Sequence, residues 1–332
     1  MLRLLCELET SSRHRGIGEI CGCSDKHQDG DIWTFPGNVE GCFGKDESSL
    51  EPVDRRGDSM KIGFNGASTM RTDLPGDIRA ASQAGYDLLE IWARKMEAYL
   101  SNHSLHDLKG LFRKAKIKPL AINSVEFITF NSPWEKMNTM RLIKRYAEIA
   151  DKLDCPYIVL VPSPRPLRVS DQRVCEESVK VLREISSQFK HHSVRFAFEF
   201  LGFQWCSVST LEKDFEIVKA VNRKNIGMVL DTFHFYAGGS NVQSIKNTDP
   251  EKIFIVHIND AEKLPKEKLQ DAHRLYPGIG VIPLTKILSG LKEVQYDGPV
   301  SIEMFRPEYW IRPAREVATQ GMRAIRRFVK DG

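Results

Sequence analysis

From Met60 onward the chain alternates short apolar runs with longer segments of helical periodicity, and this alternation constrains the fold more than any other feature. Within each run apolar residues follow one another almost without interruption, which is typical of parallel strands buried on both faces. The runs number eight and cover residues 61–65, 86–92, 118–123, 157–162, 195–200, 226–231, 252–258 and 299–304. The pattern therefore predicts an α/β protein with a parallel sheet.

The helical segments between these runs begin with N-terminal signals. Segment 132–135 (SPWE) combines a capping box with proline at the first helical position, and segment 209–212 (STLE) is interpreted as a second capping box. Eight strands with intervening helices predict a (β/α)8 TIM barrel over residues 60–332, in preference to an open doubly wound sheet. No GxGxxG motif follows the first strand, which argues against a dinucleotide-binding domain.

Residues 1–59 have a different sequence pattern. They show no sustained helical or strand periodicity and are interrupted by many glycines. We therefore expect a poorly ordered N-terminal extension over residues 1–59, followed by one barrel domain over residues 60–332. Met60, where the alternation of apolar runs and helical segments begins, is interpreted as an alternative translation start.

Composition limits the classes of partner. The chain has 41% hydrophobic and 28% charged residues, and no apolar run reaches the roughly 18 residues of a membrane helix. Its seven cysteines are odd in number and dispersed, which favours free thiols in a cytoplasmic protein. The net charge of +4 is not gathered into a basic tract. We expect no nucleic acid and no membrane partner, and the sequence leaves open whether the protein is a homo-oligomer.

Four residues of metal-ligand type occupy equivalent places on four successive runs. Glu199, Asp231, His257 and Glu303 each lie at the C-terminal end of an apolar run, and in a barrel these ends line the catalytic mouth. A single acidic residue at a strand end is more often a structural ion-pair residue. Three buried carboxylates repel one another unless a cation neutralises them, so four such residues in register predict a metal site. The ligand set suits Mn²⁺, Co²⁺, Fe²⁺, Mg²⁺ or Zn²⁺, and sequence does not choose among them.

Three further residues are expected to bind substrate around this site. His234 follows Asp231 by three residues, Arg274 lies in the loop between the seventh and eighth strands, and Asn65 ends the first strand. His234 and Arg274 are placed to bond substrate oxygens, and Asn65 to contact substrate from the opposite wall. A purely structural role is the alternative in each case: a core histidine, a surface arginine that packs the loop, and a structural asparagine.

Residues 61–330 resemble the xylose-isomerase-like barrel superfamily of sugar isomerases and epimerases, and within it the inosose isomerase family of bacterial inositol catabolism. The segments that carry this resemblance are 85–91, 117–123, 229–235, 252–258 and 300–309. The metal ligands of the family fall on Glu199, Asp231, His257 and Glu303. The chain departs from the family pattern at Ile279, where a polar residue is common, and at Asn259, where an acidic residue is usual.

The constellation and the resemblance together predict an enzyme that acts on a small-molecule polyol ketone or sugar with one divalent metal ion. The expected reaction interconverts two inososes, namely 2-keto-myo-inositol and a positional keto-inositol isomer, by proton transfer through a metal-bound enediolate. Glu199 and Glu303, from opposite sides of the cluster, are the expected catalytic acid and base, and the sequence does not assign which is which.

Four alternatives remain at this point. An inosose dehydratase or a ketose 3-epimerase would use the same metal site. An abasic-site endonuclease shares the barrel but needs several additional histidine ligands, whereas only His234 and His257 fall near strand ends. A non-catalytic sugar-binding barrel would use its metal only to hold a ligand.

Overall fold

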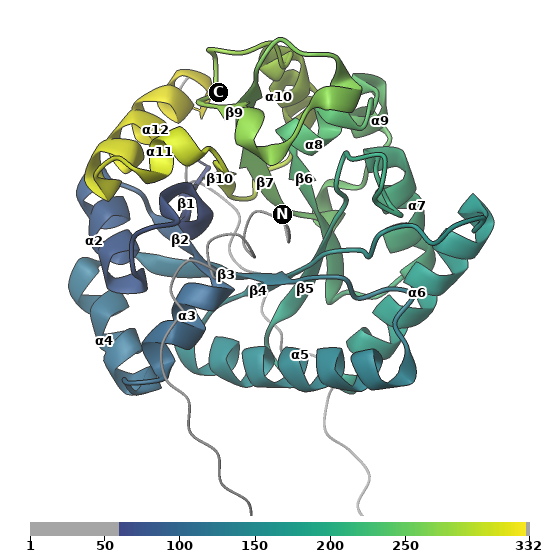
Figure 1. Cartoon of the computed structure of the whole chain (residues 1–332), viewed down its shortest axis with the longest axis horizontal. Coiled ribbons are helices and arrows are strands. Elements are labelled where there is room, and N and C mark those ends of the chain that lie inside the picture. The colour runs from purple at the N-terminus through teal and green to yellow at the C-terminus, as the bar shows by residue number, and fades with distance from the viewer. Residues whose placement is uncertain (1–59, 330–332) are drawn as a thin grey trace, which may run out of the picture. The chain divides into compact units, whose positions relative to one another are not determined.

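The computed structural model describes residues 60–329, which form a closed barrel of parallel strands surrounded by helices (Figure 1). Around the barrel the strands follow the order β1-β10-β7-β6-β5-β4-β3-β2. Their bounds are β1 Ile62–Asn65, β2 Leu88–Trp92, β3 Lys118–Val125, β4 Tyr157–Leu160, β5 Arg195–Glu199, β6 Ile226–Asp231, β7 Ile253–Ile258 and β10 Val300–Ile302. The predicted (β/α)8 TIM barrel is confirmed, and the extension predicted for residues 1–59 lies outside the described residues.

Helices and short loops connect the strands. The helices are α2 Leu74–Ala84, α3 Ala93–Leu100, α4 Leu105–Ala115, α5 Pro133–Leu153, α6 Asp171–Gln188, α7 Leu211–Val221, α8 Thr232–Ala237, α9 Val242–Lys246, α10 Leu284–Glu293, α11 Pro307–Trp310 and α12 Ala314–Val329. Four 3-10 turns (η1 Gly66–Thr69, η2 Pro250–Lys252, η3 Lys266–Lys268, η4 Asp271–His273) and an antiparallel pair, β8 Asp260–Ala261 with β9 Arg274–Leu275, complete the described elements. Within residues 60–329, every helix is too short or too polar to span a membrane.

The two predicted capping boxes have different outcomes. The box that begins α5 is confirmed: the Ser132 hydroxyl accepts from the Glu135 N–H, and the Glu135 carboxylate accepts from the Ser132 N–H. The box predicted at 209–212 is wrong by one residue, because Thr210 is the N-cap of α7. Glu212 instead accepts from the Asn241 N–H and the Ser244 hydroxyl, so it ties α7 to the first turn of α9.

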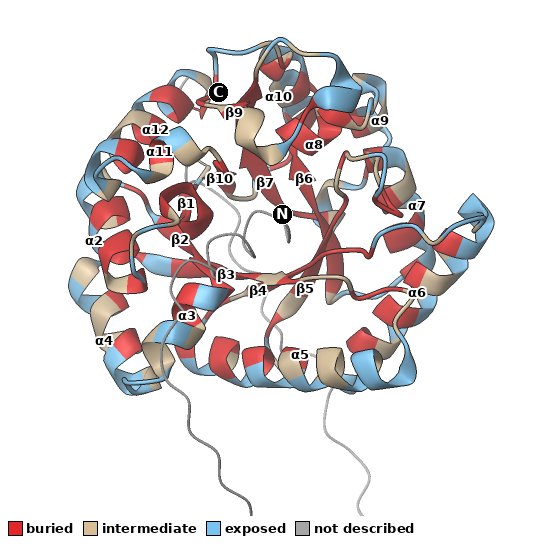
Figure 2. Cartoon of the chain, in the orientation of Figure 1, coloured by how far each residue is buried: buried red, intermediate tan, exposed pale blue. Residues whose placement is uncertain are grey.

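Apolar side chains fill both sides of the barrel wall. In Figure 2 the strands are mostly buried, while the outer helix faces are largely exposed. Between the wall and the helices lies the main core, and a second cluster fills the barrel interior: Leu88, Leu120, Ala121, Tyr157, Val159, Val161, Ala197, Val229, Phe254 and Ile255. Burial on both faces explains why the strands read as continuous apolar runs. Because most of the interior is apolar, polar side chains at the carboxyl ends of the strands are held against a packed floor.

Replacing Ser132 with alanine is expected to lower the free energy of unfolding by about 1 kcal/mol, because the first turn of α5 loses its side-chain acceptor. Equilibrium unfolding in urea measures the change. Ser132→Asp is the matched control, since aspartate caps helices as well as serine does. A loss in Ser132→Asp as large as that in Ser132→Ala would contradict the capping role.

Candidate metal centre

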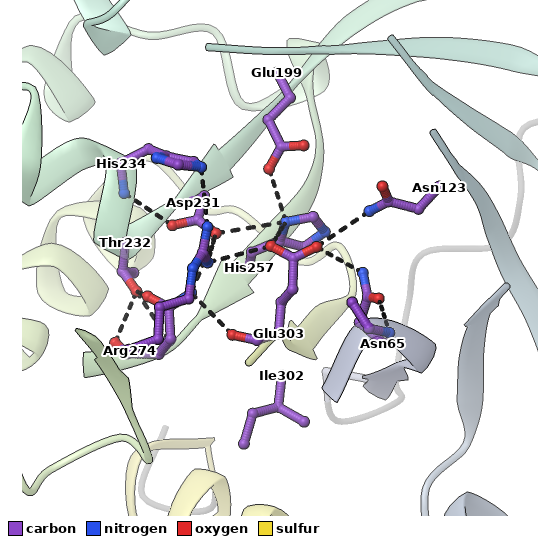
Figure 3. Close-up of polar contacts among 12 residues, drawn as sticks. Asn65, Asn123, Glu199, Asp231, Thr232, His234, His257, Arg274, Ile302 and Glu303 are labelled. Atoms are coloured by element: carbon purple, nitrogen blue, oxygen red, sulfur yellow. Dashed lines mark hydrogen bonds and ion pairs between the residues drawn. The ribbon is translucent and has the colours of Figure 1, made fainter. Parts of the chain in front are cut away.

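The barrel brings the four predicted ligands together at its carboxyl-terminal mouth (Figure 3). Glu199 ends β5, Asp231 ends β6, His257 lies one residue before the end of β7, and Glu303 directly follows β10. These strands are consecutive neighbours in the barrel, and Asp231 lies in register with His257. One ligand atom from each residue lies within 4.8 Å of the others, and all four residues are buried.

His257 is the centre of this group. Its Nδ1 lies 3.0 Å from Glu199 Oε1, 3.4 Å from Glu303 Oε2 and 3.7 Å from Asp231 Oδ2. Burial by itself lowers the pKa of His257, but the negative charges of Glu90, Glu303 and Glu199 outweigh burial and raise this pKa well above its usual value. The field around the ring is therefore strongly negative and attracts positive charge.

The three carboxylates differ in how well their charge is compensated. Burial, helped by the charges of Glu303 and Asp231, raises the pKa of Glu199 to about 7 against the opposing charge of His257. Burial also raises the pKa of Glu303. Burial has the same effect on Asp231, but the nearby Arg274 and His234 outweigh it and bring the pKa of Asp231 well below its usual value. Negative charge is thus poorly tolerated on Glu199 and Glu303 without a further cation.

Local structure fixes the Asp231 carboxylate. Asp231 caps α8, and its Oδ1 accepts from the His234 N–H at 2.9 Å. Its Oδ2 faces the other ligands and accepts from Asn259 Nδ2 at 3.1 Å. One oxygen is therefore used by the backbone, and the other is presented to the cluster.

Amide groups from the opposite wall hold Glu303. Its Oε1 accepts from Asn65 Nδ2 at 2.9 Å and from Asn123 Nδ2 at 3.3 Å. Asn65 also accepts from the Ala67 N–H through its Oδ1, so this side chain caps η1 while it contacts Glu303. The sequence-predicted Asn65 is therefore in the site, where the described contacts join it to Glu303. Its contact with substrate stays a prediction.

A buried ion pair holds the η1 turn that follows Asn65. Lys95 Nζ donates to the carbonyl oxygens of Gly66 and Thr69, both at 2.8 Å, and to Asp77 Oδ2 at 2.6 Å. All three ammonium protons have acceptors, as a buried lysine requires. The pair thereby supports the backbone from which Asn65 reaches Glu303.

Arg274 and His234 form the polar group beside Asp231. Arg274 is 1% exposed, so the alternative of a surface arginine is wrong. Its Nη1 lies 2.5 Å from Asp231 Oδ2 and 3.2 Å from Glu303 Oε2, and its Nη2 lies 2.9 Å from His234 Nε2. It is carried by β9 in the loop between β7 and β10, as the sequence places it.

The proton on His234 follows from this contact. Burial and the positive charge of Arg274, opposed by Asp231, together lower the pKa of His234 to about 4, so the ring is neutral at neutral pH. A guanidinium only donates, so Nε2 must accept and the proton must lie on Nδ1. Nδ1 is buried and has no hydrogen-bond partner among residues 60–329. The site therefore contains an unused N–H donor.

Sequence reasoning missed three side chains of the site. Asn123 contacts Glu303, Asn259 donates to Asp231, and Glu90 Oε2 lies 3.1 Å from His257 Nε2. Asn123 and Glu90 lie at or near the ends of predicted apolar runs, so the rule that selected the four ligands had the signal to find them. Asn259 is one of the departures from the family pattern, and its bond to Asp231 gives that departure a structural role.

The donor set fits a divalent cation. Two ligands at about 2.1 Å from one ion are at most about 4.2 Å apart, so a pair separated by 4.8 Å would need to close by at least about 0.6 Å. Arg274 pairs with Asp231 and Glu303. Among residues 60–329, Glu199 and Glu90 each have His257 as their ion-pair partner. Carboxylates therefore outnumber cations here, and a doubly charged ion would restore the balance.

Comparison with known proteins agrees with this architecture. A family model described as "Xylose isomerase-like TIM barrel" matches residues 78–328. Inosose isomerase of Bacillus velezensis is 41% identical over 261 residues, covering 77% of this chain and 92% of that protein, and inosose isomerase of Bacillus subtilis is likewise 41% identical over 261 residues, covering 77% and 93%.

A solved structure of the IolI protein with a bound zinc atom has a TM-score of 0.80 and 38% identity, and the match covers 82% of this chain and 99% of that one. The resemblance expected from the sequence is confirmed. The chain belongs to the xylose isomerase-like TIM barrel family.

Proposed function

We propose that this protein is a divalent-metal-dependent isomerase that interconverts inososes, with Glu199, Asp231, His257 and Glu303 as metal ligands. The observation that carries the proposal is the buried cluster in which three carboxylates surround one imidazole nitrogen. Similarity to inosose isomerases over nearly their whole length supports the choice of substrate class. The zinc in the IolI structure supports a bound divalent metal ion, and the donor set leaves its identity open.

The neutral His234 and the cationic Arg274 form the substrate side of the site. When bound, a divalent ion supplies positive charge that stabilises the oxygen anion developing on a ketone as the adjacent carbon is deprotonated. The unused Nδ1–H of His234 supplies a donor for a carbonyl or hydroxyl oxygen. Arg274 lies against His234 and places positive charge beside this donor, while its own N–H groups contact Asp271, Asp231, Glu303 and His234. A free donor and a cationic group beside a metal ligand suit a vicinal hydroxy ketone.

Glu199 and Glu303 are the proposed proton-transfer pair. They project from strands separated in the barrel by β6 and β7, so they approach the cluster from different sides (Figure 3). Burial raises the pKa of both carboxyl groups, that of Glu199 to about 7, which suits a group that must take and return a proton near neutral pH. One carboxylate removes the proton of the carbinol carbon, and a proton is returned to the former carbonyl carbon. The hydroxyl proton moves between the two oxygens, so no redox partner is consumed.

Metal content tests the proposed centre directly. The double variant Glu199→Gln/Asp231→Asn is expected to lose most of its bound metal when purified without chelator, because two anionic donors become neutral amides. The variant Glu176→Gln/Glu184→Gln removes the same charge from the exposed face of α6 and is expected to keep the parent content. Elemental analysis measures all three proteins, and equal metal in the two double variants would refute the site.

Solvent exchange tests the reaction. Incubation with 2-keto-myo-inositol in D₂O is expected to place deuterium on carbon next to the carbonyl without loss of water, as followed by NMR and mass spectrometry. Loss of water would indicate a dehydratase instead. Exchange only with free ketoses would indicate an epimerase, and binding without any exchange would indicate a sugar-binding barrel.

Kinetics separate proton transfer from metal binding. Glu303→Gln is expected to lower kcat by at least about 10²-fold with a smaller effect on KM, even at saturating metal, because a proton carrier is lost. Asp231→Asn is the comparison, since this residue is proposed only as a ligand and excess metal should restore much of its kcat. Recovery of Glu303→Gln to the same extent would reduce Glu303 to a ligand.

A further inference from the structure

We infer that Glu90 is a positioning residue for the metal centre: it accepts the Nε2 proton of His257 and so keeps the Nδ1 lone pair directed at the cluster. This inference rests on the metal centre proposed above. It adds a residue from the far wall of the barrel that is neither one of the four ligands nor a substrate contact. Glu90 lies on β2, whereas His257 lies on β7, and two other strands separate them around the barrel.

The two ring nitrogens of His257 face different surroundings. Nδ1 faces the three carboxylates of the cluster, with Glu199 Oε1 at 3.0 Å. Nε2 points the other way and lies 3.1 Å from Glu90 Oε2. The atom that His257 offers to a metal is therefore Nδ1, and Nε2 lies outside the cluster.

A metal ligand needs a free lone pair, so a neutral His257 must carry its proton on Nε2. Free imidazole can place that proton on either nitrogen. An ionised carboxylate only accepts hydrogen bonds, so Glu90 favours the tautomer with the proton on Nε2. Metal-bound histidines commonly donate their second N–H to a carboxylate in this way, and loss of such a partner typically weakens metal binding 10- to 100-fold.

Burial makes the contact between Glu90 and His257 important for the orientation of the ring. Glu90 and His257 are both 0% exposed, so bulk solvent does not reach their contact. The rest of the inward face of β2 is apolar, and Leu88 belongs to the interior cluster. Without Glu90 the buried Nε2–H would lose its carboxylate acceptor, and an unpaired buried donor is costly. The ring would then lose both its preferred tautomer and its fixed orientation.

The contact also has a purely structural explanation, in which Glu90 and His257 simply join two walls of the barrel. In that case removal of Glu90 would destabilise the metal-free protein but leave the zinc affinity of the folded protein unchanged. Metal affinity and metal-free stability therefore have to be measured on the same variants.

The test uses zinc in competition with a chromophoric chelator, with urea unfolding of the metal-free proteins in parallel. Glu90→Leu is expected to bind zinc about 10- to 100-fold more weakly than the parent, and Glu90→Gln to lose less, because an amide oxygen can still accept from Nε2. Leu88→Ala is the matched control on the same strand and inward face. It removes core packing without touching His257, so its stability should fall while its zinc affinity stays within twofold of the parent.

A double-mutant cycle tests whether Glu90 acts through His257. In a His257→Ala background, Glu90→Leu is expected to change zinc affinity less than twofold, because the ring that it positions is gone. Its full effect in that background would overturn the inference. So would parent-like affinity in Glu90→Leu, or, if that variant does not fold, a loss of less than about threefold in Glu90→Gln. Failure of the parent to bind zinc would overturn the proposed centre as well, which distinguishes the two claims.

Discussion

Electrostatic repulsion among buried carboxylates is the constraint on which the mouth of this barrel depends. Glu199, Asp231 and Glu303 converge on His257, and Glu90 approaches the same ring from the other side. In a low-dielectric interior such groups are unfavourable unless they are paired, hydrogen-bonded or bound to metal. The arrangement persists because each carboxylate has fixed donors and because the negative field can hold a cation.

The barrel meets this constraint with contacts from nearly every side. Asn65 and Asn123 hold Glu303 from β1 and β3, while Asn259 and the first turn of α8 hold Asp231. Arg274 reaches inward from the loop after β7. The hydrogen-bond donors are unequally distributed between the two glutamates. Glu303 has amide and guanidinium partners, whereas Glu199 is hydrogen-bonded to His257. Glu199 is thus the less constrained carboxylate of the proposed proton-transfer pair.

Sequence similarity and the geometry of the site together rank the alternative functions. Similarity to inosose isomerases over more than 90% of their length favours the isomerase, and the dehydratase and epimerase would use the same ligands. An abasic-site endonuclease requires more histidines than the described mouth contains, where His234 and His257 are the histidines near the cluster. His234 is hydrogen-bonded to Arg274 through one nitrogen, so it is better placed to bind substrate than a second metal ion.

Much of this protein was readable from local sequence. The eight strands are nearly continuous apolar runs because both of their faces are buried. Each of the four ligands lies at or next to the carboxyl end of such a run, so position along a strand was enough to select them. Contacts across the barrel were decided only by the tertiary structure. The bond between Glu90 and His257 joins residues 167 positions apart, and which nitrogen of His257 faces the cluster depends on the closure of the sheet. The tertiary structure also decided the partners of Arg274. A long side chain on a loop can point into a site or into solvent, and the sequence does not say which. The burial of Arg274 against Asp231 shows that it points into the site.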